Sequence, residues 1–208
     1  MTLLLEKEFG ADRIEKLRAI GLWEADANYF SFKVLFAHRM MRRADEQGLL
    51  PHEQFARGGR TPNDGTLCKI WHWDYHRTMH INHACVEADL GDCYDAVNHL
   101  VLATALRSFG VHENSVKVLL SCLQSMSFYL RSGFGISEDA ISADNALPFM
   151  GVGQGCTAAP PGFNAVSTLM INAYKKMGHD LEFRAGWSDV VAPLAAILYV
   201  DDTYLLLH

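Results

Sequence analysis

The segment ILYVDDTYLLLH, residues 197–208, places two adjacent aspartates inside a run that is otherwise apolar and strand-forming. In a regular strand neighbouring side chains point to opposite faces, so Asp201 and Asp202 cannot both face one ion there. A reversal of the chain at the aspartates removes this restriction. The pattern therefore predicts a β-hairpin with both carboxylates at its tip, where two like charges call for a nearby cation or hydrogen-bond donor. The alternative is a solvated Asp-Asp turn that binds nothing.

The bulk composition is that of a globular protein. The 208 residues are 50% hydrophobic and 20% charged, which is enough for one large domain or two smaller lobes. No apolar run is long enough to span a membrane, and the N-terminal segment MTLLLEKEFG has acids where a signal peptide has bases. Five cysteines without framework spacing are consistent with reduced thiols. We therefore expect a soluble intracellular protein, cytoplasmic or nuclear, without a membrane partner.

Charge is distributed unevenly along the chain. The net charge is −6, yet residues 13–60 hold nine Lys/Arg against six acids, whereas residues 61–208 hold eight against fifteen. A basic N-terminal part suits phosphate contacts, and an acidic remainder suits cation binding. Ordinary surface variation would explain the same distribution.

Periodicity and turn residues predict an α+β protein with a sheet packed on helices. The segment 27–48 is expected to be a helix whose apolar stripe runs through Phe30, Val34, Ala37 and Met41. Further helices are expected at 66–80, 96–110, 113–126 and 163–177, and strands at 84–90, 127–134 and 190–200. Residues 51–64 and 151–162 are expected to be Gly/Pro-rich loops.

A second acidic segment, VEADLGDCYDAV, places Asp89 at the end of the strand 84–90. If this strand pairs with residues 194–200, Asp89 lies beside Asp201. Such a cluster can hold two divalent ions about 3.5–4 Å apart, an arrangement that activates a hydroxyl and stabilises a leaving pyrophosphate. Mg²⁺ needs only a few carboxylates, because waters and substrate phosphates complete its coordination.

The segments DLGDCYD (89–95), GVGQG (151–155) followed by APPGFN, and YVDD (199–202) resemble, in order and spacing, polymerase motifs A, B and C of reverse transcriptases. The upstream segments 16–33 and 52–64 resemble fingers segments of reverse transcriptases from non-LTR retrotransposons and group II introns. The resemblance covers residues 16–208. It implies a right-hand polymerase fold, with fingers at 1–83 and a palm at 84–208 whose antiparallel sheet packs on helices.

The resemblance also implies roles for particular residues. Asp89, Asp201 and Asp202 would be catalytic and would bind two Mg²⁺ ions, or Mn²⁺ in their place, with the main-chain carbonyl of Leu90 as a further ligand. Residues from several segments would contact the incoming dNTP, namely Lys16, Arg18, Tyr94, Gln154 and Gly155. Arg57 and Arg60 would contact an RNA or DNA template with its primer, or would be solvated loop arginines.

The motif series ends at YVDD, so we expect the thumb to be absent and the chain to be part of a longer retroelement polyprotein. The resemblance predicts an RNA-directed DNA polymerase domain that transfers nucleotides from dNTP to a primer 3′-hydroxyl, with little activity in isolation. The alternatives are an RNA-dependent RNA polymerase palm and an inactive remnant that only folds or binds nucleic acid. Tyr94, the fifth residue after Asp89, favours DNA synthesis, because a bulky ring there would collide with a ribose 2′-hydroxyl.

A histidine series forms a competing candidate site. Cys68, His72, His76 and His80 recur every four residues, and His83 follows. Imidazoles at this spacing can bind zinc. Because four residues on one straight helix cannot surround an ion, at most two neighbours could share it. We therefore interpret this face as a polar boundary of the helix, with zinc as the alternative.

Overall fold

The computed structural model describes residues 1–6, 17–143, 149–179, 181–184 and 191–207. Its contacts divide the chain into two compact units. Unit 1 contains residues 1–42 and 94–163, and unit 2 contains residues 43–93 and 164–208. Each unit is described by itself below. The predicted fingers–palm boundary at residue 83 is a functional division, and it stays a prediction.

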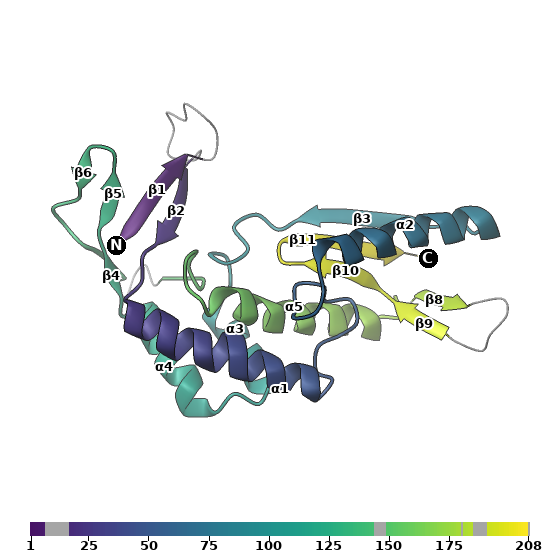
Figure 1. The fold of residues 1–208 in the computed structure, drawn as a ribbon, viewed down its shortest axis with the longest axis horizontal. Helices are drawn as coiled ribbons and strands as arrows, with labels where there is room; N and C mark the ends of the chain where they lie inside the picture. The colour runs from purple at the N-terminus through teal and green to yellow at the C-terminus, as the bar shows by residue number, and fades with distance from the viewer. Residues whose placement is uncertain (7–16, 144–148, 180, 185–190, 208) are drawn as a thin grey trace. The chain divides into compact units, whose positions relative to one another are not determined.

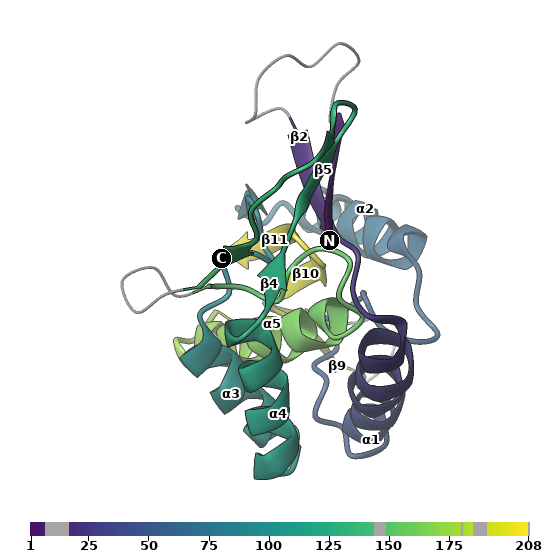
Figure 2. The same cartoon turned by 90° about the vertical axis from the view of Figure 1, so that its left-hand side faces the viewer.

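Unit 1 combines a mixed sheet with helices (Figure 1). Its elements are β1 (Thr2–Glu6), β2 (Leu17–Gly21), the π-helix η2 (Asp26–Met40), α3 (His99–Ser108), α4 (Glu113–Gln124), β4 (Ser127–Phe128), β5 (Leu130–Ser132), β6 (Gly135–Ile136) and β7 (Ile141–Ser142). The sheet has the order β2-β1-β5-β6, with β1 and β5 parallel and the other pairs antiparallel. Figure 2 shows β1, β2 and β5 side by side.

Helices α3 and α4 form an antiparallel pair whose apolar faces are buried. Leu102 and Leu106 of α3 and Val116 and Leu119 of α4 are each at most 1% exposed. Both helices begin with a side-chain cap, from Asn98 for α3 and from His112 for α4. These caps satisfy amide groups of the first turn that have no partner inside the helix.

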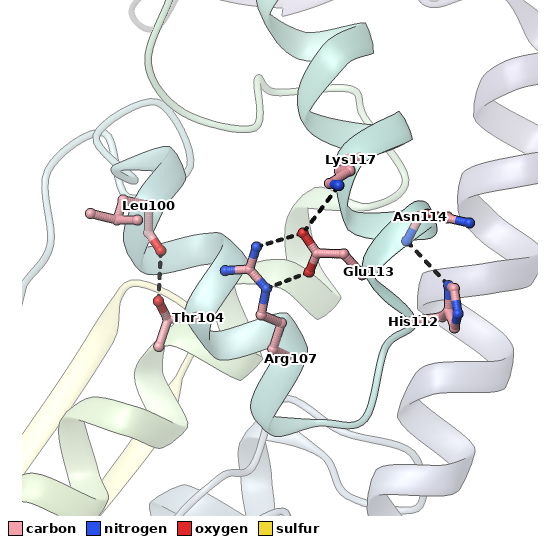
Figure 3. A network of polar contacts seen from close by, with 7 residues as sticks. All are labelled: Leu100, Thr104, Arg107, His112, Glu113, Asn114 and Lys117. Carbon is pink, nitrogen blue, oxygen red and sulfur yellow. Dashed lines mark hydrogen bonds and ion pairs between the residues drawn. The ribbon is translucent and has the colours of Figure 1, made fainter.

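An ion pair joins the end of α3 to the start of α4 (Figure 3). Arg107 donates two hydrogen bonds to Glu113, from Nε at 2.7 Å and from an Nη at 2.9 Å. These hydrogen bonds hold the pKa of Glu113 below its usual range. Because both side chains are nearly half exposed, the pair orients the turn more than it stabilises it.

The helix predicted at 27–48 is present as η2 followed by α1 (Met41–Glu46), but its predicted buried stripe is wrong. The buried residues of η2 are Phe32, Phe36 and Met40, whereas Phe30 is 63% exposed and Val34 is 37% exposed. The helix carries two apolar stripes, so composition could not decide which one faces the core. The packing of the helix in the fold, and not its sequence, buries the stripe through Phe32.

Unit 2 is built around an antiparallel sheet of order β10-β11-β3. Its elements, with α1 and α5 running across the division between units, are α2 (Pro62–Met79), β3 (Ala84–Asp89), α5 (Ala159–Lys176), β8 (Leu181–Arg184), β9 (Val191–Leu194), β10 (Ala196–Tyr199) and β11 (Asp202–Leu207). Strands β8 and β9 form a separate hairpin. The predicted α+β class, with an antiparallel sheet packed on helices, is confirmed.

Strand alternation gives this sheet two buried faces, and helices α2 and α5 lie on opposite sides of it (Figure 1). On one face Ile197 and Tyr204 form a core with Phe55, and Cys68 of α2 packs against it. On the other face Ala196 and Leu198 pack with Ile171 of α5. The sheet therefore lies between α2 and α5, which is why β10 reads as a continuous apolar run.

The segment 53–56 belongs to the predicted loop 51–64, which ends earlier than predicted because α2 begins at Pro62, and it lies against the edge of β10. The Leu198 amide donates to the Glu53 carbonyl at 2.9 Å, and the Phe55 amide donates to the Leu198 carbonyl at 2.8 Å. Glu53 is fully buried, and its carboxylate accepts from Lys175 of α5 at 3.0 Å and from the Ala195 amide at 3.2 Å. The segment thus covers a sheet edge and ties it to α5.

Among the residues that the structure describes, no helix is both long and apolar enough to cross a membrane.

Candidate functional site

The two aspartates of YVDD lie at the tip of the β10–β11 hairpin, as predicted. Asp201 is in the turn, and Asp202 is the first residue of β11. Val200 precedes them with φ of 57°, a left-handed conformation that is a genuine outlier for a β-branched residue. The tip is therefore a strained turn that presents exposed carboxylates at the end of an otherwise apolar strand pair.

Asp89 joins this tip, although through a different strand pairing from the predicted one. Strand β3 pairs with β11 and not with residues 194–200, so Asp89 is opposite Asp202 in the register. Directly opposite residues in an antiparallel pair place their side chains on the same face of the sheet. The Leu90 amide also donates to the Asp201 carbonyl at 3.1 Å, which closes the end of the pairing. Asp89, Asp201 and Asp202 thus gather at one end of the sheet.

A cavity of about 460 Å³ in unit 2 is lined by Asp89 and Asp202. Lys69 of α2 lines it too and pairs with Glu87. Opposed, exposed carboxylates are donors of the type that a hydrated Mg²⁺ uses, so the chemistry of the residues fits the ion. Across the described residues, no three His, Cys, Asp or Glu side chains already converge on a metal position.

The glycine-rich loop 151–155 belongs to unit 1, where two segments hold it by its backbone. On one side the Val152 amide donates to the Tyr94 carbonyl at 2.8 Å, and the Gly151 amide donates to the Val97 carbonyl at 2.9 Å. A Cβ on Gly151 would lie 2.4 Å from the Asp95 Cα, so only glycine permits this approach. The loop is therefore joined to the chain that follows Asp89.

On its other side the loop is held by residues that sequence reasoning missed. The Gly21 amide donates to the Gln154 carbonyl at 2.7 Å. The Asn28 side chain donates to the Gly155 carbonyl at 3.0 Å and accepts from the Thr157 amide at 2.7 Å. A single asparagine near a helix start gives no sequence signal for such a contact.

The predicted nucleotide-binding residues that the structure describes all lie in unit 1. Gln154 lines a cavity of about 670 Å³, together with Trp23 and Ser121. Tyr94 is half-buried, and its ring meets Phe163 edge-on at 6.0 Å between centroids. Arg18 is exposed on β2, opposite Leu5 in the register. Lys16 lies outside the described residues.

The two arginines predicted to bind nucleic acid have partners within unit 2. Arg57 pairs with Asp45 at 2.5 Å and donates to the Leu50 carbonyl at 3.3 Å. Arg60 donates to the His52 carbonyl at 2.8 Å, and its guanidinium lies 4.8 Å from the centre of the Phe55 ring. These contacts give both arginines a structural role. Their template contact stays a prediction.

The histidine face of α2 is not the polar boundary that we predicted. His72 and His76 are 0% and 3% exposed, and their rings lie 4.4 Å apart between centroids. The ring of His83 completes the group, at 5.2 Å from His72 and 4.7 Å from His76. Burial, followed by the charges of His76 and His83, lowers the pKa of His72 to about 4. His72 and His76 are therefore aromatic members of the core and not part of a polar boundary.

Solved structures of telomerase have the same fold as this chain. Telomerase from Candida tropicalis truncated from its C-terminal domain aligns with 92% of this chain at a TM-score of 0.51 and 13% identity. Telomerase from the same organism in complex with a TWJ fragment of telomeric RNA aligns with 94% at 0.54 and 12% identity. The chain spans 41% and 35% of the length of these two proteins. No protein family and no curated protein matches the sequence.

These likenesses confirm the fold class predicted from the sequence. The chain has a reverse-transcriptase-like fold of the polymerase fingers–palm type, with antiparallel strands packed on helices. At such low identity they show the fold alone.

Replacing Gly155 by alanine tests the packing of the glycine-rich loop. Gly155 has φ of +96°, and an added Cβ would lie 2.2 Å from the Gly21 carbonyl oxygen. Gly178 has φ of +89° with no atom within 4 Å of an added Cβ, so Gly178→Ala is the matched control. We expect Gly155→Ala to lower the free energy of unfolding by about 1–2 kcal/mol more than Gly178→Ala, measured by urea denaturation. Equal losses would mean that the loop is not held against Gly21.

The buried His72 predicts a loss of stability in mild acid. Its folded pKa of about 4 lies below the ordinary value of 6.5, so the unfolded chain binds a proton that the folded chain excludes between these values. The stabilisation is complete above pH 6.5 and is lost as the pH falls toward 4. His72→Phe keeps an aromatic ring and cannot titrate. Its free energy of unfolding should fall less than that of the wild type between about pH 7 and pH 5; parallel curves would contradict this assignment.

Proposed function

We propose that this chain is the fingers and palm part of an RNA-directed DNA polymerase of the non-LTR retrotransposon type. It would extend a primer by transferring a nucleotide from dNTP to the 3′-hydroxyl, with RNA or DNA as template. The observation that carries the proposal is the register of β3 and β11, which sets Asp89 opposite Asp202 beside Asp201. The telomerase-like fold and the motif order along the chain support it.

The three aspartates would hold two Mg²⁺ ions, or Mn²⁺, with the Leu90 carbonyl as a further ligand. Bound there, the ions would supply Lewis acidity toward the phosphates and the attacking hydroxyl. The protein's part is to hold charged oxygens at one sheet end before substrate arrives, which the strained turn at Val200 and the Leu90–Asp201 hydrogen bond support. Exposure of all three aspartates leaves room for water and phosphate ligands.

The remaining residues would position the nucleotide. Arg18 and Lys16 would contact its phosphates, and Gln154 and Gly155 would contact its base and sugar. Tyr94 would lie under the sugar and exclude a 2′-hydroxyl. The hydrogen bond between the Tyr94 carbonyl and the Val152 amide supports this grouping, because it ties the Tyr94 segment to the loop that carries Gln154. Arg57 and Arg60 would add template contacts.

Replacing Asp201 by asparagine tests the metal site. Mn²⁺ is a paramagnetic ion, so its binding to the chain can be titrated without an activity assay. Asp201→Asn and Asp89→Asn should each weaken Mn²⁺ binding about tenfold or more, because each removes an anionic ligand. Asp139→Asn, an exposed aspartate in unit 1, is the control and should bind Mn²⁺ as the wild type does.

When this chain is fused to a polymerase thumb domain, the same Asp201→Asn substitution should abolish Mg²⁺-dependent primer extension. Because Asp201 is exposed, the free energy of unfolding of the variant should stay within about 0.5 kcal/mol of the wild-type value. Full extension by the variant would contradict the polymerase proposal.

Replacing Tyr94 by valine tests whether this residue selects deoxynucleotides over ribonucleotides. A buried hydroxyl without a partner costs about 1–3 kcal/mol, so the wild-type ring should favour deoxynucleotides by about tenfold or more. In the thumb-fused protein, Tyr94→Val should raise ribonucleotide incorporation and spare deoxynucleotide use. Tyr94→Phe keeps the ring and should retain the wild-type discrimination. Unchanged discrimination in Tyr94→Val would instead favour an RNA polymerase or another gate.

A further inference from the structure

The outward surface of η2 carries a shallow groove of about 360 Å³ that the roles proposed above leave unused. Five of its lining residues belong to η2 and the sixth to α1. They are Tyr29, Lys33, Val34, His38, Arg39 and Arg42. We call this set the basic face of η2. None of its members is acidic, in a chain whose net charge is −6. A concentration of positive charge on an acidic protein calls for an anionic partner.

The basic face combines cations with exposed aromatic rings. Tyr29 is 54% exposed, and the neighbouring Phe30 is 63% exposed. The Lys33 ammonium lies 4.3 Å from the centre of the Tyr29 ring. These apolar rings do not serve the core, since the buried side of η2 is formed by Phe32, Phe36 and Met40. A structural role in packing therefore does not explain them.

Cations interleaved with exposed rings match one chemistry in particular. A single-stranded nucleic acid presents phosphates at regular intervals and unpaired bases that stack on aromatic side chains. The face from Tyr29 to Arg42 is roughly 15–20 Å long, at about 1.5 Å or less per residue, which accommodates a few nucleotides. An acidic protein segment would satisfy the charges but would leave the exposed rings without a partner.

We propose that the basic face of η2 binds the phosphodiester backbone of a single-stranded nucleic acid, with Lys33 and Arg39 on phosphates and Phe30 against a base. This inference rests on the proposed function, because it adds a contact surface for the template strand. It assigns that surface to residues other than Arg57 and Arg60, which are engaged within unit 2.

Anisotropy of fluorescein-labelled oligouridine and oligothymidine, each about twelve nucleotides long, tests the surface on the intact chain. Lys33→Gln/Arg39→Gln removes two charges, and Lys117→Gln/Lys176→Gln removes two exposed charges elsewhere as a matched control. We expect the first variant to bind about tenfold or more weakly near 0.1 M salt. Its salt slope should fall by roughly 1.4, at about 0.7 for each phosphate contact. The control should bind as the wild type does.

Two further variants separate charge from fold and from stacking. Lys33→Arg/Arg39→Lys preserves both charges and should restore wild-type binding. Phe30→Ala should weaken binding several-fold and leave the salt slope unchanged, because stacking releases no counterions. Stronger binding of oligouridine than of oligothymidine would assign the surface to an RNA template, and the reverse would assign it to DNA.

The proposal is overturned if the wild type binds neither oligonucleotide, if the two double-Gln variants bind alike, or if polyglutamate competes as well as RNA. The last result would identify an acidic protein as the partner. Mn²⁺ binding by Asp201 and primer extension are measured separately from these binding experiments. A basic face that binds no nucleic acid can therefore be told apart from a failure of the polymerase proposal.

Discussion

The buried segment 53–56 holds unit 2 together. It supplies the hydrogen bonds that the outer edge of β10 needs, and its side chains reach α5 on the next layer. Burying the Glu53 carboxylate is costly unless it is paired, and Lys175 and the Ala195 amide offset that cost. Gln54 adds a buried hydrogen bond to Ser167 at 2.9 Å, and Asn164 donates to the Ala56 carbonyl at 2.6 Å. With the edge covered, strands β10, β11 and β3 are fixed in register, and the aspartates at their end are fixed with them.

The site at that end combines stability with exposure. Apolar faces bury Ile197, Leu198 and Leu206 on the strands that lead to it, whereas Asp89, Asp201 and Asp202 stay open to solvent. Mutual repulsion of these carboxylates is tolerated because the strands beneath are held by packing on both faces. The strained backbone at Val200 is also unfavourable, and the same packing compensates for it. In the proposed polymerase, this exposure would leave room for metal ions and substrate phosphates at the three carboxylates.

Unit 1 depends on glycines in a different way. The loop 151–155 approaches Asp95 on one side and Gly21 on the other so closely that a side chain would collide with backbone. Close backbone contact makes the loop a joint between the segment after Asp89 and the start of η2, and Asn28 completes it. In the proposed polymerase this joint would carry both Tyr94 and Gln154. The basic face of η2 begins one residue after Asn28, so the same helix would serve nucleotide and template.

The sequence by itself determined what depends on near neighbours in the chain. Asp201 and Asp202 had to be at a turn, because an apolar strand pair cannot otherwise present both, and Gly178 follows a predicted helix that is present. The start of α2 at Pro62, four residues before the predicted start at 66, was not foreseen. Only the tertiary structure decided what depends on the surface that a segment meets. Strands 84–89 and 196–199 are both apolar enough to pair, yet β11 lies between them. The tertiary structure likewise decided which apolar stripe of η2 is buried and that His72 and Glu53 are buried. A local sequence pattern does not encode which partner covers a side chain.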